Sequence, residues 1–301
     1  MATTLASSTG TEQHTIPVVE HRNGVDQHTQ PSLYQPRWDA PDHGRYVSKE
    51  EYWAKWYEAS PSYEWNDGYL EAKPMPNIIQ LRLFHWFFEL LHQYIQTYHN
   101  AELMSLETGF SMIVPNLQKP GAMREVTRKP DLAVIRHDNP VRWLEHERSY
   151  HGICDLCVEA ISDSDPGEIN RDIKIKKSEY EFAGVQEYYI LDPANQHMHF
   201  YQRNAAGVYI EMQPDADGIL RSQILPGFQF RRSDLNRQPT LEELALDQVY
   251  QGYVLLLYQA ATKQAAQERQ RAEQEQQRAE QEQQRAERYA AKLRELGIDV
   301  E

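Results

Sequence analysis

Two acidic residues and a lysine between residues 129 and 193 have the types and the order that metal-dependent cleavage of a phosphodiester requires. Lys129-Pro130-Asp131 precedes one apolar run, Glu159 lies inside a second, and Lys176 follows in a charged segment. Carboxylates on two paired strands can bind one divalent cation, and a lysine beside them can hold or activate a water. The sequence therefore predicts Asp131, Glu159 and Lys176 as catalytic residues.

The two acids differ in what their positions indicate. Pro130 disfavours helical backbone at Lys129, so Asp131 stands at the entrance of a strand, where an acid is often only a turn residue. Glu159 interrupts the apolar run 156–161, and a carboxylate inside such a strand is unfavourable to bury unless it is paired or bound to metal. The alternative is an outward-facing Glu on a half-exposed strand, and we favour the functional interpretation.

A helix predicted over residues 168–182 carries the remaining candidates. Asp172, Lys176 and Tyr180 are spaced by four residues and share one face of it. On that face the stem of Lys176 can lie along apolar surface and bring the ammonium toward the acids, whereas the alternative is a solvated helix with one salt bridge. Asp172 is a candidate accessory residue, and the candidates for phosphate contact are Arg171, Lys174 and Lys177.

The elements that position these residues follow a mixed pattern. An amphipathic helix is predicted over 78–98, because apolar residues recur at helical spacing at Leu81, Phe84, Phe88, Leu91 and Ile95. A hairpin is predicted around residues 66–68, and strands are predicted at 103–106, 110–114, 132–135, 156–161, 188–191, 198–201 and 208–212. Because hairpins replace a regular βαβ alternation, the sequence favours an α+β fold over a doubly wound sheet.

The chain divides into three predicted regions. Residues 1–45 are polar and aperiodic and predict a flexible arm, and residues 46–238 predict the globular domain. Residues 239–301 predict a helical tail, in which a seven-residue unit recurs from Arg271. An Ala-lined seam runs along this tail, but its second position is mostly Gln. A solvated single helix and a weak coiled coil therefore remain equal interpretations.

Composition and charge limit the classes of function. No apolar run is long enough to span a membrane and residues 1–10 lack a signal-peptide pattern, so we expect a soluble, cytoplasmic protein. Cys154 and Cys157 have no second ligand pair nearby, which favours buried free thiols over a zinc site. The net charge is −14, of which residues 261–301 hold only −1, with eight Lys and Arg against nine Asp and Glu. General affinity for DNA should therefore be weak.

Four motifs together resemble a known family. They are Pro130-Asp131-Leu132-Ala133-Val134, Val158-Glu159-Ala160-Ile161-Ser162, Asp172-x-x-x-Lys176-x-x-x-Tyr180 and the segment Ala183 to Pro193. In this order they resemble the putative restriction endonuclease family of the PD-(D/E)XK nuclease superfamily, which is bacterial. Tyr63-Glu64 followed by Asp67-Gly68 is similar to the N-terminal motif of that family. The resemblance spans about residues 48–235.

The resemblance implies a restriction-endonuclease-like mixed β-sheet core flanked by helices, and cleavage of DNA that depends on Mg²⁺ or Mn²⁺. It implies that Asp131, Glu159 and the main-chain carbonyl of Ala160 hold the metal, with Glu64 as an accessory residue. The usual lysine, two residues after the second acid, would fall at Ile161, so its role passes to Lys176. A histidine that is frequent at the start of the long helix is absent from residues 77–80.

Other functions are compatible with the same residues. One is an inactive scaffold with a nuclease fold that binds a partner, or a second copy, through the nuclease domain or the C-terminal helix. Glycoside hydrolysis by a carboxylate pair is weaker, because it leaves Lys176 without a role. The sequence contains no phosphate-binding Gly-rich loop, dinucleotide fingerprint or serine-hydrolase motif, so those classes have no support.

Overall fold

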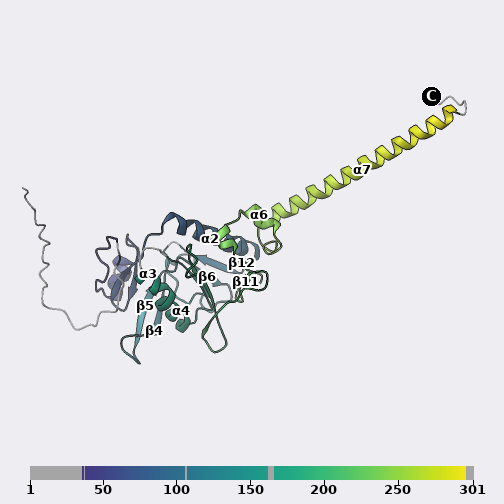
Figure 1. Cartoon of the computed structure of the whole chain (residues 1–301). Helices are drawn as coiled ribbons and strands as arrows, with labels where there is room; N and C mark the ends of the chain where they lie inside the picture. Colours follow the sequence, from purple (N-terminus) through teal and green to yellow (C-terminus); the bar gives the residue numbers. More distant parts are fainter. Residues whose placement is uncertain (1–35, 37, 106, 162–165, 296–301) are drawn as a thin grey trace, which may run out of the picture.

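The structure, a computed structural model, describes residues 36, 38–105, 107–161 and 166–295. Its helical segments are α1 (Lys49–Glu51), η1 (Tyr52–Trp56), α2 (Ile78–Tyr98), α3 (Pro166–Asn170), η2 (Arg171–Lys176), α4 (Lys177–Ala183), α5 (Asp234–Arg237), α6 (Leu241–Leu246) and α7 (Leu256–Glu295), of which η1 and η2 are π-helical. Its strands are β1 (Tyr63–Asn66), β2 (Tyr69–Ala72), β3 (Ala101–Met104), β4 (Phe110–Pro115), β5 (Met123–Arg128), β6 (Leu132–Arg136), β7 (Leu156–Ala160), β8 (Glu187–Leu191), β9 (His199–Arg203), β10 (Tyr209–Glu211), β11 (Ile219–Arg221) and β12 (Gln229–Arg231). The expected mixed α+β fold with a long C-terminal helix is confirmed (Figure 1).

Two sheets form the body of the molecule. The larger has six strands in the order β10-β9-β8-β7-β6-β3, and the smaller has four in the order β2-β1-β5-β4. In the larger sheet β7 and β8 pair in parallel, whereas the other neighbouring strands pair antiparallel. A parallel pair needs a crossover connection, and here the crossover contains α3, η2 and α4. That connection is what brings the charged helix back beside the ends of β6 and β7.

Side chains of the six-stranded sheet alternate between two cores. The core on the side of α2 contains Leu132, Val134, Leu156 and Val158. The core on the side of α4 and β4 contains Ala133, Ile135 and Cys157. Successive residues of a strand point to opposite faces, so odd-numbered residues of β6 and β7 face α4. Both cysteines are free and buried, as expected.

Helix α2 matches the predicted range, but its buried face differs from the predicted one. Asn77 caps the helix by accepting hydrogen bonds from the N–H groups of Ile79 and Gln80. The fully buried apolar residues are Leu83, Phe87, Leu90, Leu91 and Tyr94 with Ile95. The helix carries apolar residues on two adjoining faces, so spacing alone did not identify the core face. Consequently Leu81, Phe84 and Phe88, which we predicted to face the core, are only half-buried.

The N-terminal hairpin is confirmed around Asp67 and Gly68. Both residues have positive φ, 49° and 99°, which is the backbone that a tight two-residue hairpin turn requires. Of the arm predicted over residues 1–45, residues 1–35 and 37 lie outside the described part of the chain. Among the described residues of that range, Trp38 and Ala40 pack against the aromatic core beneath η1.

Three strands were not predicted from the sequence, namely β5, β11 and β12. Strand β5 reads Met-Arg-Glu-Val-Thr-Arg, a pattern typical of a solvated segment, yet Arg124 and Arg128 are buried in it. The globular part also continues beyond the predicted boundary at residue 238, because Leu244, Tyr250 and Val254 pack into the main core. The exposed tail therefore begins at α7.

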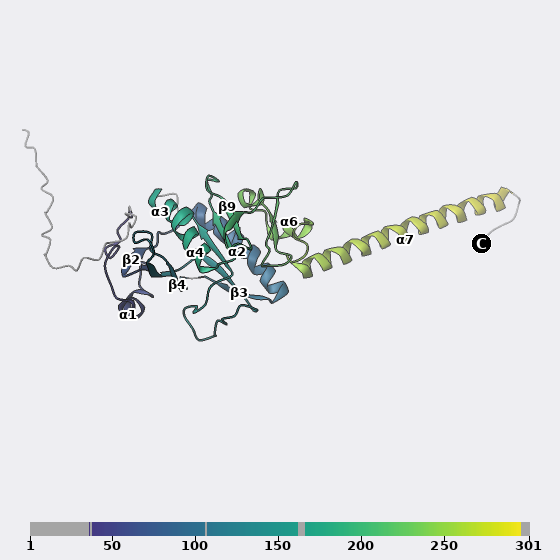
Figure 2. The same ribbon diagram turned by 90° about the horizontal axis from the view of Figure 1, so that it is seen from below.

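Helix α7 extends away from the rest of the molecule in both views (Figures 1 and 2). None of its residues is buried, and hydrogen bonds four residues apart, such as Gln276 to Glu280, run along it. No helix among the described residues is both long and apolar enough to cross a membrane.

We predict that ending the chain after Thr262 leaves the stability of the globular part unchanged. Among the deleted residues that the structure describes, 263–295, no side chain is buried, so the free energy of unfolding should change by less than about 0.5 kcal/mol. Denaturation by urea, followed by circular dichroism near the unfolding midpoint of the full chain, measures this. A loss of several kcal/mol would mean that the tail packs against the globular part or against a second copy.

Candidate active site

Asp131 and Glu159 are brought together by the pairing of β6 and β7. In that pairing Leu132 lies opposite Val158 and Ala133 opposite Cys157, so one further step places Asp131 opposite Glu159. Both have odd numbers and therefore point to the α4 face. The Asp131 carboxylate accepts a hydrogen bond from the N–H of Ala160 at 2.8 Å, which fixes it beside the end of β7. The predicted convergence of the two acids is present.

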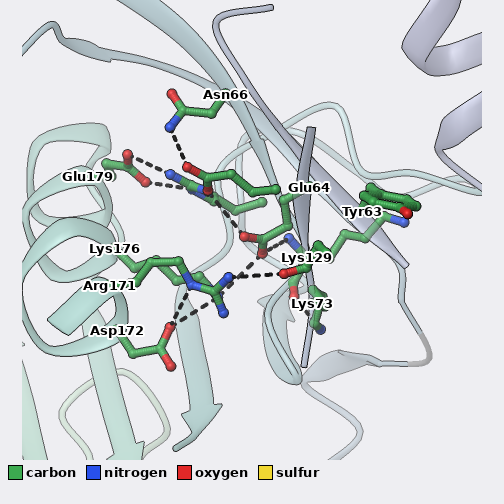
Figure 3. Close-up of polar contacts among 12 residues, drawn as sticks. Tyr63, Glu64, Asn66, Lys73, Lys129, Arg171, Asp172, Lys176 and Glu179 are labelled. Atoms are coloured by element: carbon green, nitrogen blue, oxygen red, sulfur yellow. Dashed lines mark hydrogen bonds and ion pairs between the residues drawn. The ribbon is translucent and has the colours of Figure 1, made fainter. Parts of the chain in front are cut away.

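Lys176 lies at the centre of a group of carboxylates. Its ammonium is 2.9 Å from the Glu159 carboxylate and 3.3 Å from those of Glu64 and Asp172. The side chain is completely buried, and Tyr180 donates a hydrogen bond to the other oxygen of Glu159 at 2.9 Å. Figure 3 shows Lys176 and Asp172 pointing from the helix toward Glu64 on the facing strand. The predicted spacing of four residues thus gives one continuous polar face.

The charges in this group are unequally compensated. Burial raises the pKa of Glu159 to about 8, and the Asp131 and Asp172 carboxylates add to this rise against the opposing effect of Lys176. Burial opposes ionisation of Glu64 as well, but Lys176 and Arg128 outweigh it and hold its pKa well below the ordinary value. Burial likewise disfavours the Lys176 ammonium, but Glu159 and Glu64 raise its pKa. Lys176 thus contacts three carboxylates, and of the two whose pKa shifts, Glu159 is less stabilised as an anion than Glu64.

Glu64 is held by β5, the strand that was not predicted. Arg128 is fully buried and donates a hydrogen bond to Glu64 at 3.1 Å, another to Glu71, and two to Glu179, at 2.7 and 2.8 Å. The N–H of Lys129 donates to the second oxygen of Glu64 at 2.9 Å. This network connects the four-stranded sheet to α4, so it fixes the distance between Glu64 and Lys176.

Lys73 is a cation of the site that the sequence interpretation missed. It directly follows β2, and its ammonium is 3.1 Å from the Asp131 carboxylate and 3.4 Å from that of Glu107. It also donates a hydrogen bond to the carbonyl of Lys129 at 2.8 Å. Burial disfavours the charged form, but Asp131 and Glu107 raise the pKa of Lys73, so it remains an ammonium. Its position directly before Pro74 carries no recognisable sequence signal.

Of the three residues predicted to contact phosphate, one lies at the cavity and two do not. Arg171 lines the same cavity as the acids, next to Asp172. The prediction is wrong for Lys174 and Lys177: Lys174 is exposed away from the cavity, and the Lys177 ammonium lies 4.7 Å from the ring centre of Tyr201. Lys174 and Lys177 are two residues before and one residue after Lys176, so helical geometry directs them away from the face that carries it.

A cavity of about 270 Å³ lies over these groups. Its polar lining comprises Lys73, Gln80, Glu107, Asp131, Glu159, Arg171 and Asp172, with Ala160 between them. Lys176 lies beneath the lining rather than in it. The charged groups that a bound molecule would meet are therefore the carboxylates of Glu107, Asp131, Glu159 and Asp172, together with Lys73 and Arg171.

The donor set fits a hard divalent cation. The described residues contain no group of three or more His, Cys, Asp or Glu placed to hold a metal ion. Mg²⁺, however, usually keeps several waters and binds through one or two carboxylates, and all the candidate donors here are oxygen atoms. The carboxylates of Asp131 and Glu159, with the carbonyl of Ala160, suit Mg²⁺ or Mn²⁺ and do not suit a thiolate-type or imidazole-type metal site.

Comparison with known proteins finds a matching family and a similar solved structure. A family model described as Uma2, putative restriction endonuclease, matches residues 50–236, which include both acids and Lys176. The chain is also similar to a crystal structure of a putative nuclease belonging to DUF820 from Anabaena variabilis ATCC 29413. The identity is 16% and the TM-score 0.46, over 60% of this chain and 93% of that chain. No curated protein matches the chain.

Proposed function

This chain belongs to the Uma2 family of putative restriction endonucleases, and we propose that it hydrolyses phosphodiester bonds in DNA with the help of Mg²⁺ or Mn²⁺. The observation that carries the proposal is the pairing of Asp131 with Glu159 at the ends of β6 and β7, inside a cavity that also presents Lys73 and Arg171. Beside these carboxylates, a bound divalent cation together with Lys73 and Arg171 would offset the charge of a phosphodiester while a water attacks.

The residues of the site would have two roles, binding the cation and positioning the residues that bind it. Asp131, Glu159 and the carbonyl of Ala160 would hold the cation, which when bound lowers the pKa of a water and polarises the phosphate. Lys176 is a positioning residue, because it is buried beneath the cavity and fixes Glu159 through a 2.9 Å ion pair. Glu64 and Asp172, the predicted accessory residues, hold the Lys176 ammonium in turn.

The cations that face the cavity are Arg171 and Lys73. Both can contact the phosphate oxygens, on which negative charge builds as the bond breaks. Lys73 also contacts Asp131, so a divalent cation that binds there must share or replace this ion pair. The expected outcome is moderate affinity for the cation.

The proposal predicts that DNA cleavage depends strictly on a divalent cation. A single-stranded DNA and a supercoiled plasmid are each incubated with the full chain, and DNA should be cut with Mg²⁺ or Mn²⁺ and left intact with EDTA. Calorimetric titration of Mn²⁺ should show a saturable site that is lost in a Glu159→Gln variant. Equal cleavage in EDTA would contradict the proposal.

A second candidate function is a non-catalytic scaffold with a nuclease fold. The observation that favours it is that each acid of the site already has a cation of this chain as a partner, such as Lys73 for Asp131. The same titration separates the two functions, because a scaffold should bind Mn²⁺ no better than the Glu159→Gln variant does.

A further inference from the structure

The cavity has two walls of opposite character, and cleavage of a phosphodiester accounts for only one of them. The polar wall carries the acids, Lys73 and Arg171. The other wall is apolar and consists of Pro74, Pro76, Leu81 and Phe84, with His85 at its edge. Hydrolysis alone needs no apolar surface, so this wall indicates a further part of the bound molecule.

Phe84 is the residue of this wall best placed for an aromatic contact. The core face of α2 is occupied by Leu83 and Phe87, which turns Phe84 partly toward the cavity. Its ring is half-buried against the main core and lies 5.6 Å from the ring of His85, centre to centre. A ring held in this way presents a fixed surface on which a planar group can stack.

Exposed apolar residues continue this wall along the chain. Met75 lies between Pro74 and Pro76 and is 80% exposed, and Ile78 and Ile79, in the first turn of α2, are 61% and 57% exposed. Large apolar side chains gathered on one surface usually mark a site that binds another molecule. Here they lie along the same segment, 74–81, that provides the apolar wall.

The charge of the chain limits how it can hold DNA. A net charge of −14 disfavours binding through the phosphate backbone alone. Stacking of bases on aromatic side chains does not depend on positive charge, but it needs a base whose face is free. In a duplex each base is covered by its neighbours, and a cavity of about 270 Å³ has no room for a base pair with its flanking bases.

We propose that the apolar wall at Phe84 binds one unpaired nucleobase adjacent to the scissile phosphate, so that single-stranded DNA is the substrate. This inference rests on the proposed function, since it takes the polar wall as the place of the phosphate. The base lies against Phe84 while Arg171 and Lys73 face the phosphate.

Binding measurements on a chain that cannot cut test this inference. All variants carry Asp131→Asn, and fluorescence anisotropy gives Kd for a labelled single strand and for the duplex of the same sequence, with Mg²⁺ present. The single strand should bind more tightly than the duplex. Adding Phe84→Leu, which keeps an apolar side chain but removes the ring, should weaken single-strand binding roughly 5- to 150-fold.

The matched control is Phe88→Leu. Phe88 lies one turn further along α2, is half-buried against the same core and does not line the cavity, so its replacement should leave both Kd values unchanged. Equal binding of duplex and single strand, or no effect of Phe84→Leu, would overturn the inference. Failure of the proposed function would be recognised by a different measurement, DNA cleavage, because the Asp131→Asn chain would then cut DNA as well as the native chain does.

Discussion

Replacing Asp131 by Asn is expected to lower the rate of Mg²⁺-dependent DNA cleavage at least 10²- to 10³-fold, about the effect of removing one group that stabilises a transition state. The amide keeps the shape of the side chain and one oxygen that can accept the hydrogen bond from Ala160. It removes the negative charge that a divalent cation needs at this position. Binding of Mn²⁺ should weaken together with the rate.

The control for this experiment is Asp217→Asn, an exposed aspartate in a turn far from the cavity lining. It removes one acid from the chain and should leave both the rate and the affinity for Mn²⁺ unchanged. Circular dichroism and thermal unfolding should show that both variants fold. If Asp131→Asn cuts DNA at the native rate, the acids of this cavity are not the catalytic acids.

Replacing Arg128 by Met is expected to produce the largest loss of stability of any single substitution near the site. The guanidinium is completely buried and donates to Glu64, Glu71 and Glu179. Removing one partner of a buried ion pair lowers stability by about 3–5 kcal/mol, because the remaining charge is left without compensation. For a globular part of this size that corresponds to a fall in Tm of roughly 6–20 °C.

Two further variants test the reason for this loss. Arg221→Met removes an exposed arginine that pairs with Asp215 and should change the free energy of unfolding by less than about 1 kcal/mol. Combining Arg128→Met with Glu71→Gln removes the guanidinium together with the charge of an acid that pairs with it, keeps an oxygen for the hydrogen bond from Asn66, and should recover part of the lost stability. If the double variant is less stable than Arg128→Met alone, repulsion among the remaining acids is not the cause.

Features that depend on a few neighbouring residues were predictable from the sequence. The hairpin at Asp67 and Gly68 follows from the need for positive φ at both positions, and the range of α2 follows from the helical spacing of its apolar residues. The spacing of Asp172 and Lys176 correctly placed both side chains on one helical face. These signals act over four residues or fewer, so the fold around them does not alter them.

Features that depend on distant partners were not predictable in the same way. Strand β5 resembles a solvated segment until Glu64, Glu71 and Glu179 are known to surround Arg128. By their spacing, Phe84 and Phe87 of α2 are both compatible with a place in the core. Only the packing shows that Phe87 is buried and Phe84 is not.

By itself the sequence determined which residues could do the chemistry: two acids, each at a strand, and a lysine on the next helix. The tertiary structure alone decided that Asp131 stands opposite Glu159, that Lys176 is buried beneath them, and that Lys73 reaches the same cavity. The physical reason is that strand register and the burial of charge are set by contacts between segments tens of residues apart, which no local pattern specifies.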